Sequence, residues 1–408
     1  MTAAAPALPV RQKNDYVAVL VAFASFVVIG LPGSLLGIAW ASDEWPSIQK
    51  FFGLGIEAVG ALSLTFTIGY FTASFISGRL FARFSTAMIF TGGTLISAVG
   101  LAGYILVPSW VVIVGCGLLV GFGGGLLDAG MNIYFAAIYG PRLMNWLHAC
   151  FGIGATLGAL VMTVIFQNGG TWQNGYMVVL ALYAIQGGLF FVTRGRWQKV
   201  GGSGEANVSA PAARTLRLPI VWIGILVFVF YAGLEAVPIQ WLSPLFNQAR
   251  GIEAGVAGTW VSIFLASFTA GRIFFGMIVT RITPVTLIRL CIVVMLITAG
   301  ALALNLLPES AVIWAAVYGF AVSPIFALVV TNTQERLGPV HGANAIGFYV
   351  ASASLGFGVL PGIAGVLAGQ SSLEIVPKLM LGLLVVMAVM YEVMMSRRLQ
   401  KHLIPTTD

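Results

Sequence analysis

Apolar stretches of about 20 residues recur from one end of this 408-residue sequence to the other. Each is long enough to cross the roughly 30 Å hydrocarbon core of a bilayer as a helix. The stretches lack the alternating pattern of a β-barrel, and every backbone polar group in lipid must be satisfied internally. Charged residues make up 8% of the chain, against roughly 25% in a soluble domain. The sequence therefore predicts an all-α polytopic membrane protein.

Twelve transmembrane helices are predicted, in two sets of six. The first six are expected at Tyr16–Trp40, Glu57–Phe81, Thr86–Val107, Trp110–Tyr139, Leu143–Phe166 and Gln173–Val192. The last six are expected at Leu218–Trp241, Gly255–Thr280, Pro284–Leu306, Ala311–Leu337, His341–Ala368 and Leu373–Ser396.

A polar segment from Thr193 to Arg217 separates the two sets. It contains GGSGEANVSAPAAR, a composition that predicts a flexible linker. We therefore expect an N-terminal six-helix bundle over residues 1–193 and a cytoplasmic linker over residues 194–217. A C-terminal six-helix bundle with a short cytoplasmic tail is expected over residues 218–408.

The basic residues predict the orientation. With the N-terminus inside, 17 of the 20 basic residues are cytoplasmic, and Lys50, Arg250 and Lys378 are outside. The positive-inside rule then places both termini and the linker in the cytoplasm, with the protein in the cell (inner) membrane. The net charge of +7 does not indicate nucleic-acid binding, because the basic residues lie at the ends of spans. The cytoplasmic set is Arg11, Lys13, Arg79, Arg83, Arg142, Arg194, Arg196, Lys199, Arg214, Arg217, Arg272, Arg281, Arg289, Arg336, Arg397, Arg398 and Lys401.

The two halves of the sequence resemble each other. GRLFARFS follows the second span and GMIVTRIT follows the eighth. A shift of 198 residues pairs Gly78 with Gly276 and Arg83 with Arg281. The fifth span, with Asn145, has its counterpart in the eleventh, with Asn344 and another Gly-rich run. Two six-span halves of this kind are typical of the major facilitator architecture, in which solute binds near the midplane between the halves.

The layout of two six-span sets and the Gly-x-x-x-x-Arg turns resemble the major facilitator superfamily over essentially the whole chain. The resemblance implies that Gly78, Arg83, Gly276 and Arg281 belong to the gating turns. The usual family turn has an acidic residue before the Arg. Ala82 and Thr280 stand at those places here, so a charge-based contact between helices is expected to be weaker.

Four stretches are similar to the fucose permease-like branch of this superfamily: LDAGMN from Leu127, NWLHACFGIGATLG from Asn145, YAGLEAVPIQWL from Tyr231 and YGFAVSPIF from Tyr318. The resemblance implies uptake of a sugar or similar polar solute, driven by a cation gradient. The fucose carriers have an acidic residue in the first span. GLPGSLLGIAW from Gly30 has none, so fucose itself is not the expected solute.

Asp128 and Asn132 are four residues apart and share one face of the fourth span. An ionisable side chain inside an apolar span costs at least about 2.5 kcal/mol unless it faces protein or water. The glycines from Gly121 to Gly125 allow another helix to approach closely. We interpret Asp128 as a protonatable switch and Asn132 as a substrate contact. A structural hydrogen-bonding role for this pair is the alternative.

His148 lies about six residues into the fifth span, at a level similar to that of Asp128 along the membrane normal. A neutral His can donate to Asp128, and a protonated one can stabilise its anion. We therefore include His148 among the cation-coupling candidates. Capping or packing at a helix start is the alternative.

Glu235 is the other carboxylate well within a span, and Pro238 predicts a break or kink nearby. A carboxylate accepts hydrogen bonds from solute hydroxyls, and aromatic faces stack on C–H groups. We therefore expect Glu235 to contact the cation or the solute. The alternative is that Glu235 is satisfied by neighbouring helices and that Trp241 belongs to the interfacial aromatic belt. The expected substrate-binding set is Asn132, Tyr231, Glu235, Gln240, Trp241, Asn344 and Tyr349; Tyr70, Asn332 and Ser352 are weaker polar candidates.

These observations predict a monomeric secondary active transporter that works by alternating access, with a proton or Na⁺ as coupling ion, the proton being favoured. The sequence shows no metal-ligand cluster, nucleotide motif or nucleophile–base pair, so an enzyme is not expected. Cys116, Cys150 and Cys291 lie in apolar spans and match no metal spacing. An exporter of drugs or amphiphiles on the same fold is the alternative, since aromatic and Met side chains suit an adaptable apolar cavity.

Overall fold

The computed structural model describes residues 15–40, 46–55, 58–200, 210–306 and 308–396, and these residues form helices without any strand. The first half contains α1 (Tyr16–Trp40), α2 (Ile48–Phe52), α3 (Val59–Arg83), α4 (Thr86–Leu106), α5 (Trp110–Ile138), α6 (Pro141–Gln167) and α7 (Trp172–Val192). The second half contains α8 (Ala212–Thr215), α9 (Pro219–Pro244), α10 (Ala254–Ile278), α11 (Pro284–Ala303), α12 (Ala311–Val322), α13 (Ile325–Gln370) and α14 (Ile375–Met395).

The predicted twelve spans are confirmed. Eleven helical stretches in the described part of the chain are long and apolar enough to cross a membrane, and one of them, Ala311–Gln370, has 60 residues. A straight helix of that length would extend about 90 Å, three times the hydrocarbon thickness. The backbone turns at Gly338, where φ is +62°, so this stretch supplies two spans. Glu57, the predicted start of the second span, lies outside the described residues, and α3 begins at Val59.

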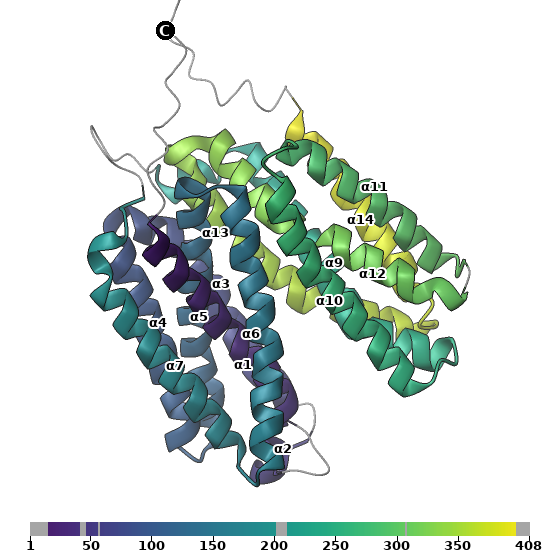
Figure 1. Ribbon diagram of the computed structural model, residues 1–408, viewed down its shortest axis with the longest axis horizontal. Helices are drawn as coiled ribbons and strands as arrows, with labels where there is room; N and C mark the ends of the chain where they lie inside the picture. The colour runs from purple at the N-terminus through teal and green to yellow at the C-terminus, as the bar shows by residue number, and fades with distance from the viewer. Residues whose placement is uncertain (1–14, 41–45, 56–57, 201–209, 307, 397–408) are drawn as a thin grey trace, which may run out of the picture.

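The helices form two bundles, α1 and α3–α7 in one and α9–α14 in the other (Figure 1). The packing partners repeat: α1 packs on α6 as α9 packs on α13, and α3 packs on α5 as α10 packs on α12. A Cβ added at Gly121 would overlap the backbone of Phe66, and one added at Gly319 would overlap Phe264. Each partner in the second pair lies 198 residues after its counterpart in the first. The predicted six-helix pseudo-repeat is therefore confirmed at the level of individual contacts.

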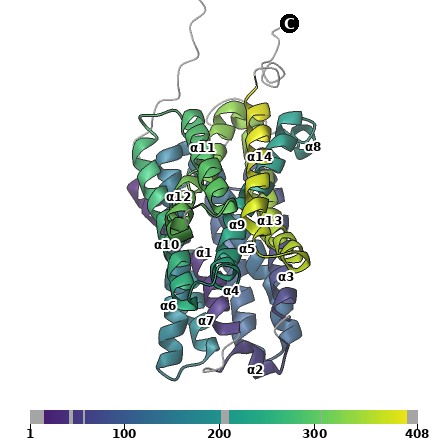
Figure 2. The same cartoon turned by 90° about the vertical axis from the view of Figure 1, so that its right-hand side faces the viewer.

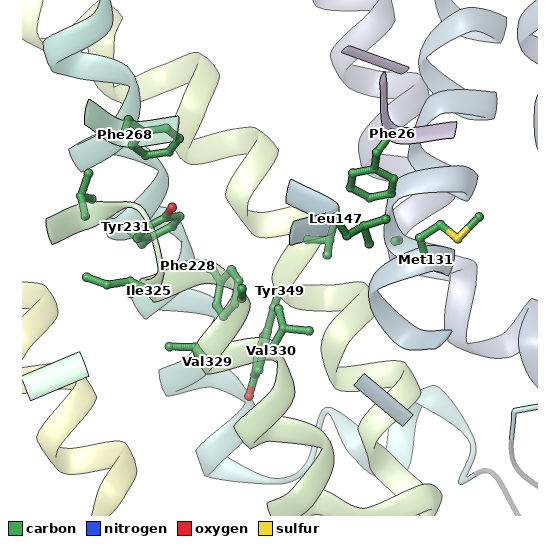
Figure 3. Packing of buried hydrophobic residues seen from close by; sticks show 14 of the residues in the cluster. Phe26, Met131, Leu147, Phe228, Tyr231, Phe268, Ile325, Val329, Val330 and Tyr349 are labelled. Carbon is green, nitrogen blue, oxygen red and sulfur yellow. The ribbon is translucent and has the colours of Figure 1, made fainter. Parts of the chain in front are cut away.

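The two bundles approach each other at one end and diverge towards the end that carries α2 (Figure 1). Figure 2 shows α2 at the end of the molecule opposite to α8. The contact is made by α3 against α13 and by α6 against α10. Gly78 lies against the backbone of Asn344, and Gly276 lies against the indole of Trp146. Both glycines are near the end where α1 begins and α14 ends. Apolar side chains from both bundles pack at this junction (Figure 3).

Both described ends of the predicted linker lie against a bundle. On the first bundle, Trp197 is buried and the Gln198 carbonyl accepts a hydrogen bond from Thr86 Oγ1 at 2.7 Å. On the second, Ala210 N donates to Val340 O at 2.9 Å, and Asn344 Nδ2 donates to Ala210 O at 2.8 Å. The linker is thus held on both sides of residues 201–209, which lie outside the described residues.

Candidate functional site: a polar cluster between the bundles

Asp128 meets a tyrosine because two helices pack unusually closely around it. A Cβ added at Gly125 would lie 2.5 Å from the Tyr70 carbonyl oxygen, so only glycine lets α3 approach α5 at this level. Tyr70, a weaker candidate in the sequence, thereby donates its hydroxyl to Asp128 Oδ2. Gly123 packs in the same way against Gly93 and Ser97 of α4. The predicted close approach at the glycine run involves two neighbouring helices.

Asn132 satisfies the other oxygen of Asp128. Its Nδ2 donates to Asp128 Oδ1 at 3.1 Å and to the Asp128 carbonyl at 2.9 Å. With Tyr70 on Oδ2, both carboxylate oxygens act as acceptors, which is the pattern of the ionised form. Among the described residues, no cationic side chain forms an ion pair with Asp128. The groups that hydrogen-bond directly to its two oxygens are therefore neutral donors.

His148 connects this group to the second bundle. Its Nε2 lies 3.0 Å from Asn132 Oδ1; because an amide oxygen only accepts, Nε2 carries the proton and donates. The imidazole packs edge-on to Phe26 of α1 and Phe326 of α13, with ring centroids 5.5 and 4.7 Å away. His148 thus contacts Asn132 rather than Asp128 itself, in a position that apolar rings enclose.

Glu235 lies on the opposite bundle with its own donors. Tyr231 donates its hydroxyl to Glu235 Oε2 at 2.8 Å, and Arg272 Nη2 lies 3.5 Å from Glu235 Oε1. The carboxylate side chain is 17% exposed, against 7% for that of Arg272. Glu235 is the more accessible member of this ion pair.

Of the break or kink predicted near Pro238, a break does not occur, since α9 continues to Pro244. Proline lacks the amide proton that would bond the carbonyl four residues earlier, which here belongs to Leu234. The hydroxyl of Tyr318 on α12 donates to that carbonyl at 3.1 Å. The neighbouring helix replaces the missing hydrogen bond, so the helix stays continuous and Glu235 keeps its place.

Arg272 corrects the sequence interpretation. The positive-inside count places it among residues that orient the chain, but it is 6% exposed and lies between the bundles. Its Nη1 donates to the His148 carbonyl at 3.0 Å across the α6–α10 contact. It lies nine residues before Arg281, or about 13 Å deeper along α10. The position of Arg272 deep in its span could be inferred from the sequence, whereas its contacts with Glu235 and His148 could not.

The polar cluster therefore consists of Tyr70, Asp128, Asn132, His148, Tyr231, Glu235 and Arg272. It contains one carboxylate from each bundle and one guanidinium, that of Arg272, which pairs with Glu235 of the second bundle and bonds the His148 carbonyl of the first. With His148 neutral, two carboxylates and one guanidinium leave one net negative charge. No group of three or more His, Cys, Asp or Glu suited to a metal ion exists within the described ranges.

Four of the expected substrate-binding residues lie away from this cluster. Gln240 is exposed, and Trp241 donates to the Pro361 carbonyl at 2.9 Å. Tyr349 is buried and stacks on Phe228 at 4.9 Å between centroids (Figure 3). Asn344 lies at the α3–α13 contact. Of the expected substrate-binding set, Tyr231, Glu235 and Asn132 therefore belong to the polar cluster, and the other four residues lie outside it.

The weaker candidates other than Tyr70 make local contacts. Asn332 Nδ2 lies 3.8 Å from Met395 Sδ, a contact between α13 and α14. Ser352 donates to the Tyr349 carbonyl at 2.8 Å within α13.

The predicted gating residues divide into two kinds. Gly78 and Gly276 lie at the α3–α13 and α6–α10 contacts, where a side chain would overlap the partner. Arg83 and Arg281 are exposed at the ends of α3 and α10. Neither forms an ion pair with a residue that the structure describes. In this conformation the close approach of the bundles depends on the glycines.

Comparison with known proteins agrees with this architecture. Residues 18–344 match the Major Facilitator Superfamily, and the chain belongs to this family. It is therefore a multi-pass membrane transporter and not an enzyme.

Two relatives are similar over most of their length. An uncharacterised MFS-type transporter of Yersinia pestis is 24% identical over 84% of this chain and 86% of its own. The sodium-dependent glucose transporter 1A of Mus musculus is 24% identical over 91% of this chain and 95% of its own.

The fold is also similar to solved structures of FucP. One is FucP in the outward conformation, with a TM-score of 0.73, 14% identity and coverage of 91% of this chain and 98% of that chain. A second, a variant of the E. coli fucose:proton symporter FucP, has the same TM-score and identity and covers 92% of this chain and 98% of that chain.

Proposed function

We propose that this transporter is a secondary active symporter for a small polar solute, a sugar being favoured, and that a cation gradient, preferably of protons, drives it. The polar cluster carries this proposal, because it places one carboxylate of each bundle near the junction and links them through Asn132, His148 and the Arg272–Glu235 ion pair. The names of the sodium-dependent glucose transporter and the fucose:proton symporter support the same class of solute.

The proton is favoured by the surroundings of Asp128. Tyr70 and Asn132 direct O–H and N–H groups at its two oxygens. Na⁺ would need those oxygens as ligands, whereas a proton occupies one oxygen and removes the charge. Protonation of Asp128 also neutralises the one net negative charge of the cluster. A cation that binds one conformation more tightly than another shifts the balance between them.

Glu235 is the proposed solute contact. Its carboxylate is partly exposed and is held by Tyr231, whose ring lies 6.0 Å from that of Phe326. A partly exposed acid beside aromatic faces suits a polyol, since hydroxyls donate to the acid and C–H groups lie on the rings. Asn132 is the proposed second polar contact.

We propose that the end at which the bundles meet is cytoplasmic, as the distribution of basic residues predicts. The protein would then be closed to the cytoplasm and face outward, with its described termini, Asp15 and Ser396, on the cytoplasmic side. Separation of the α3–α13 and α6–α10 contacts would open the cytoplasmic side. We propose that the protein works in this way as a monomer in the cell membrane.

Purified protein in liposomes tests the function, with labelled sugars and with proton and Na⁺ gradients imposed separately. Asp128→Asn and Glu235→Gln are expected to abolish gradient-driven accumulation and to leave some exchange, because each removes a titratable group but keeps a polar side chain. Glu392→Gln is the matched control, since Glu392 lies in an exposed ion pair with Arg289. Normal accumulation by both site variants would contradict the coupling proposal.

A further inference from the structure

Arg272 makes the charged contact between the bundles at the polar cluster. It extends from α10 of the second bundle to the His148 carbonyl on α6 of the first, at 3.0 Å. Trp146 of α6 donates from Nε1 to the Ile273 carbonyl at 3.3 Å in the same contact. Hydrogen bonds from a charged donor are roughly twice as strong as neutral ones. Arg272 therefore contributes the stronger of these two bonds across the α6–α10 contact.

The buried charge of Arg272 depends on Glu235. The guanidinium lies 4.2 Å from the ring centroid of Phe268, and its Nε is buried with no hydrogen-bond partner. The ionisable side chains that face it are Glu235 and Tyr231 of α9, His148 of α6 and Asp128 of α5. Of these, only Glu235 forms an ion pair with it among the described residues. Leaving one member of a buried ion pair without its partner is strongly destabilising.

We infer that Arg272 is a positioning residue that couples occupation of Glu235 to the contact between the bundles. An ionised, unoccupied Glu235 holds the guanidinium in place to bond the His148 carbonyl. When Glu235 takes a proton, the guanidinium loses its counter-charge; when Glu235 accepts hydroxyls of a solute, those hydroxyls compete with the guanidinium for the carboxylate oxygens. In both cases the guanidinium moves towards water. The bond to α6 is then lost, and α6 and α10 separate. This inference rests on the proposed alternating-access function.

Arg79 provides a matched comparison within the same chain. The stretches Ala73–Phe81 and Ala266–Phe274 read ASFISGRLF and ASFTAGRIF, with arginine at the same place in each. Arg79 is exposed, whereas Arg272 is buried between the bundles. Substitution of Arg79 removes the same charge from a nearly identical helical sequence without touching the polar cluster.

Spin-label distances across the contact end test the inference without solute or gradient. Labels go on Ala82→Cys and Thr280→Cys, both at exposed positions, after the three native cysteines are replaced by alanine. The ratio of separated to closed populations is expected to rise at least about tenfold in Arg272→Gln, the effect of losing one charged hydrogen bond. Arg79→Gln is expected to leave the ratio unchanged.

Two further variants test whether Glu235 and Arg272 act on the contact together, and a second label pair tests whether the fold is preserved. Glu235→Gln is expected to shift the ratio in the same direction as Arg272→Gln, and the double variant no further than Arg272→Gln alone. A label pair within the first bundle, Ala82→Cys with Val192→Cys, reports whether that bundle remains intact. Unchanged populations in Arg272→Gln and in the double variant, with this control distance preserved, would overturn the inference.

The distance result is independent of the transport result. A population shift in Arg272→Gln without any sugar accumulation by the unmodified protein would leave the contact role standing and remove the proposed solute. Cation-driven sugar accumulation by the unmodified protein, with no population shift in Arg272→Gln, would leave the proposed function standing and remove the contact role of Arg272.

Discussion

Tyr231 contributes to the polar cluster in two separable ways. Its hydroxyl donates to Glu235 at 2.8 Å, while its ring packs among the aromatic side chains of Phe228 and Phe326. Tyr231→Phe removes the hydroxyl and keeps the ring. We expect a rise of at least about tenfold in the KM for solute, the value of one hydrogen bond to a charged group. The melting temperature should stay near that of the unmodified protein, and a KM that does not change would place Glu235 outside the solute site.

Glu374 forms an ion pair with Arg250 that lies outside the polar cluster. Arg250 Nε and Nη2 donate to its two oxygens at 2.8 and 2.9 Å, and Nη2 also donates to the Leu302 carbonyl at 2.7 Å. The hydrogen bonds from Arg250 hold the pKa of the Glu374 carboxyl below its usual value. Arg250 therefore ties the segment that follows α9 to α11 and to the start of α14.

Glu374→Gln is expected to lower stability by about 1 kcal/mol at pH 7, because the carboxylate is partly exposed and screened. A depressed pKa stabilises the folded state above the unfolded pKa, about 4.3 for Glu. This contribution is lost as the pH falls through the lower folded value. The difference in melting temperature between the two proteins should therefore be present at neutral pH and disappear in acid. A difference that persists at low pH would show that Gln alters packing rather than charge.

At the level of helices, glycine decides how closely neighbouring spans approach. Gly78 of α3 lies so close to Asn344 that an added Cβ would be 2.7 Å from its Cα. Gly60 of the same helix has open space around it. The two positions differ in surroundings rather than in local sequence preference.

Gly78→Ala is expected to slow solute exchange roughly tenfold, because overpacking of about 1–3 kcal/mol opposes the closed contact between α3 and α13. Gly60→Ala should exchange at the unmodified rate. Exchange in counterflow with labelled solute measures both. Equal rates in the two variants would show that this contact does not limit transport.

For the molecule as a whole, alternating access requires α6 and α10 to separate once per cycle. A Cβ at Gly152 of α6 would lie 3.2 Å from Thr269 Oγ1 of α10, a spacing that suits a disulfide. Oxidation of Gly152→Cys with Thr269→Cys is expected to stop uptake, and a reductant should restore it. Each single cysteine variant, oxidised in the same way, is the control. Continued uptake by fully cross-linked protein would exclude separation at this contact.

Much of the architecture follows from the sequence alone. Span length and hydropathy predict twelve helices, and the shift of 198 residues predicts which positions of the two bundles correspond. The same reasoning identifies Asp128, Asn132, His148 and Glu235, because a polar side chain deep in an apolar span needs a protein or water partner. These are properties of one helix at a time, readable from spacing along the chain.

The tertiary structure decides which side chains meet. It brings Tyr70 and Arg272 into the cluster and places Tyr349 and Asn344 elsewhere, and it keeps α9 continuous at Pro238 through Tyr318 of another helix. Helical periodicity specifies the face and depth of a residue, but not the neighbouring helix that covers that face. The role of Arg272 depends on α6 and α9, which lie 124 and 37 residues away at His148 and Glu235. Such contacts arise only when the two bundles pack together.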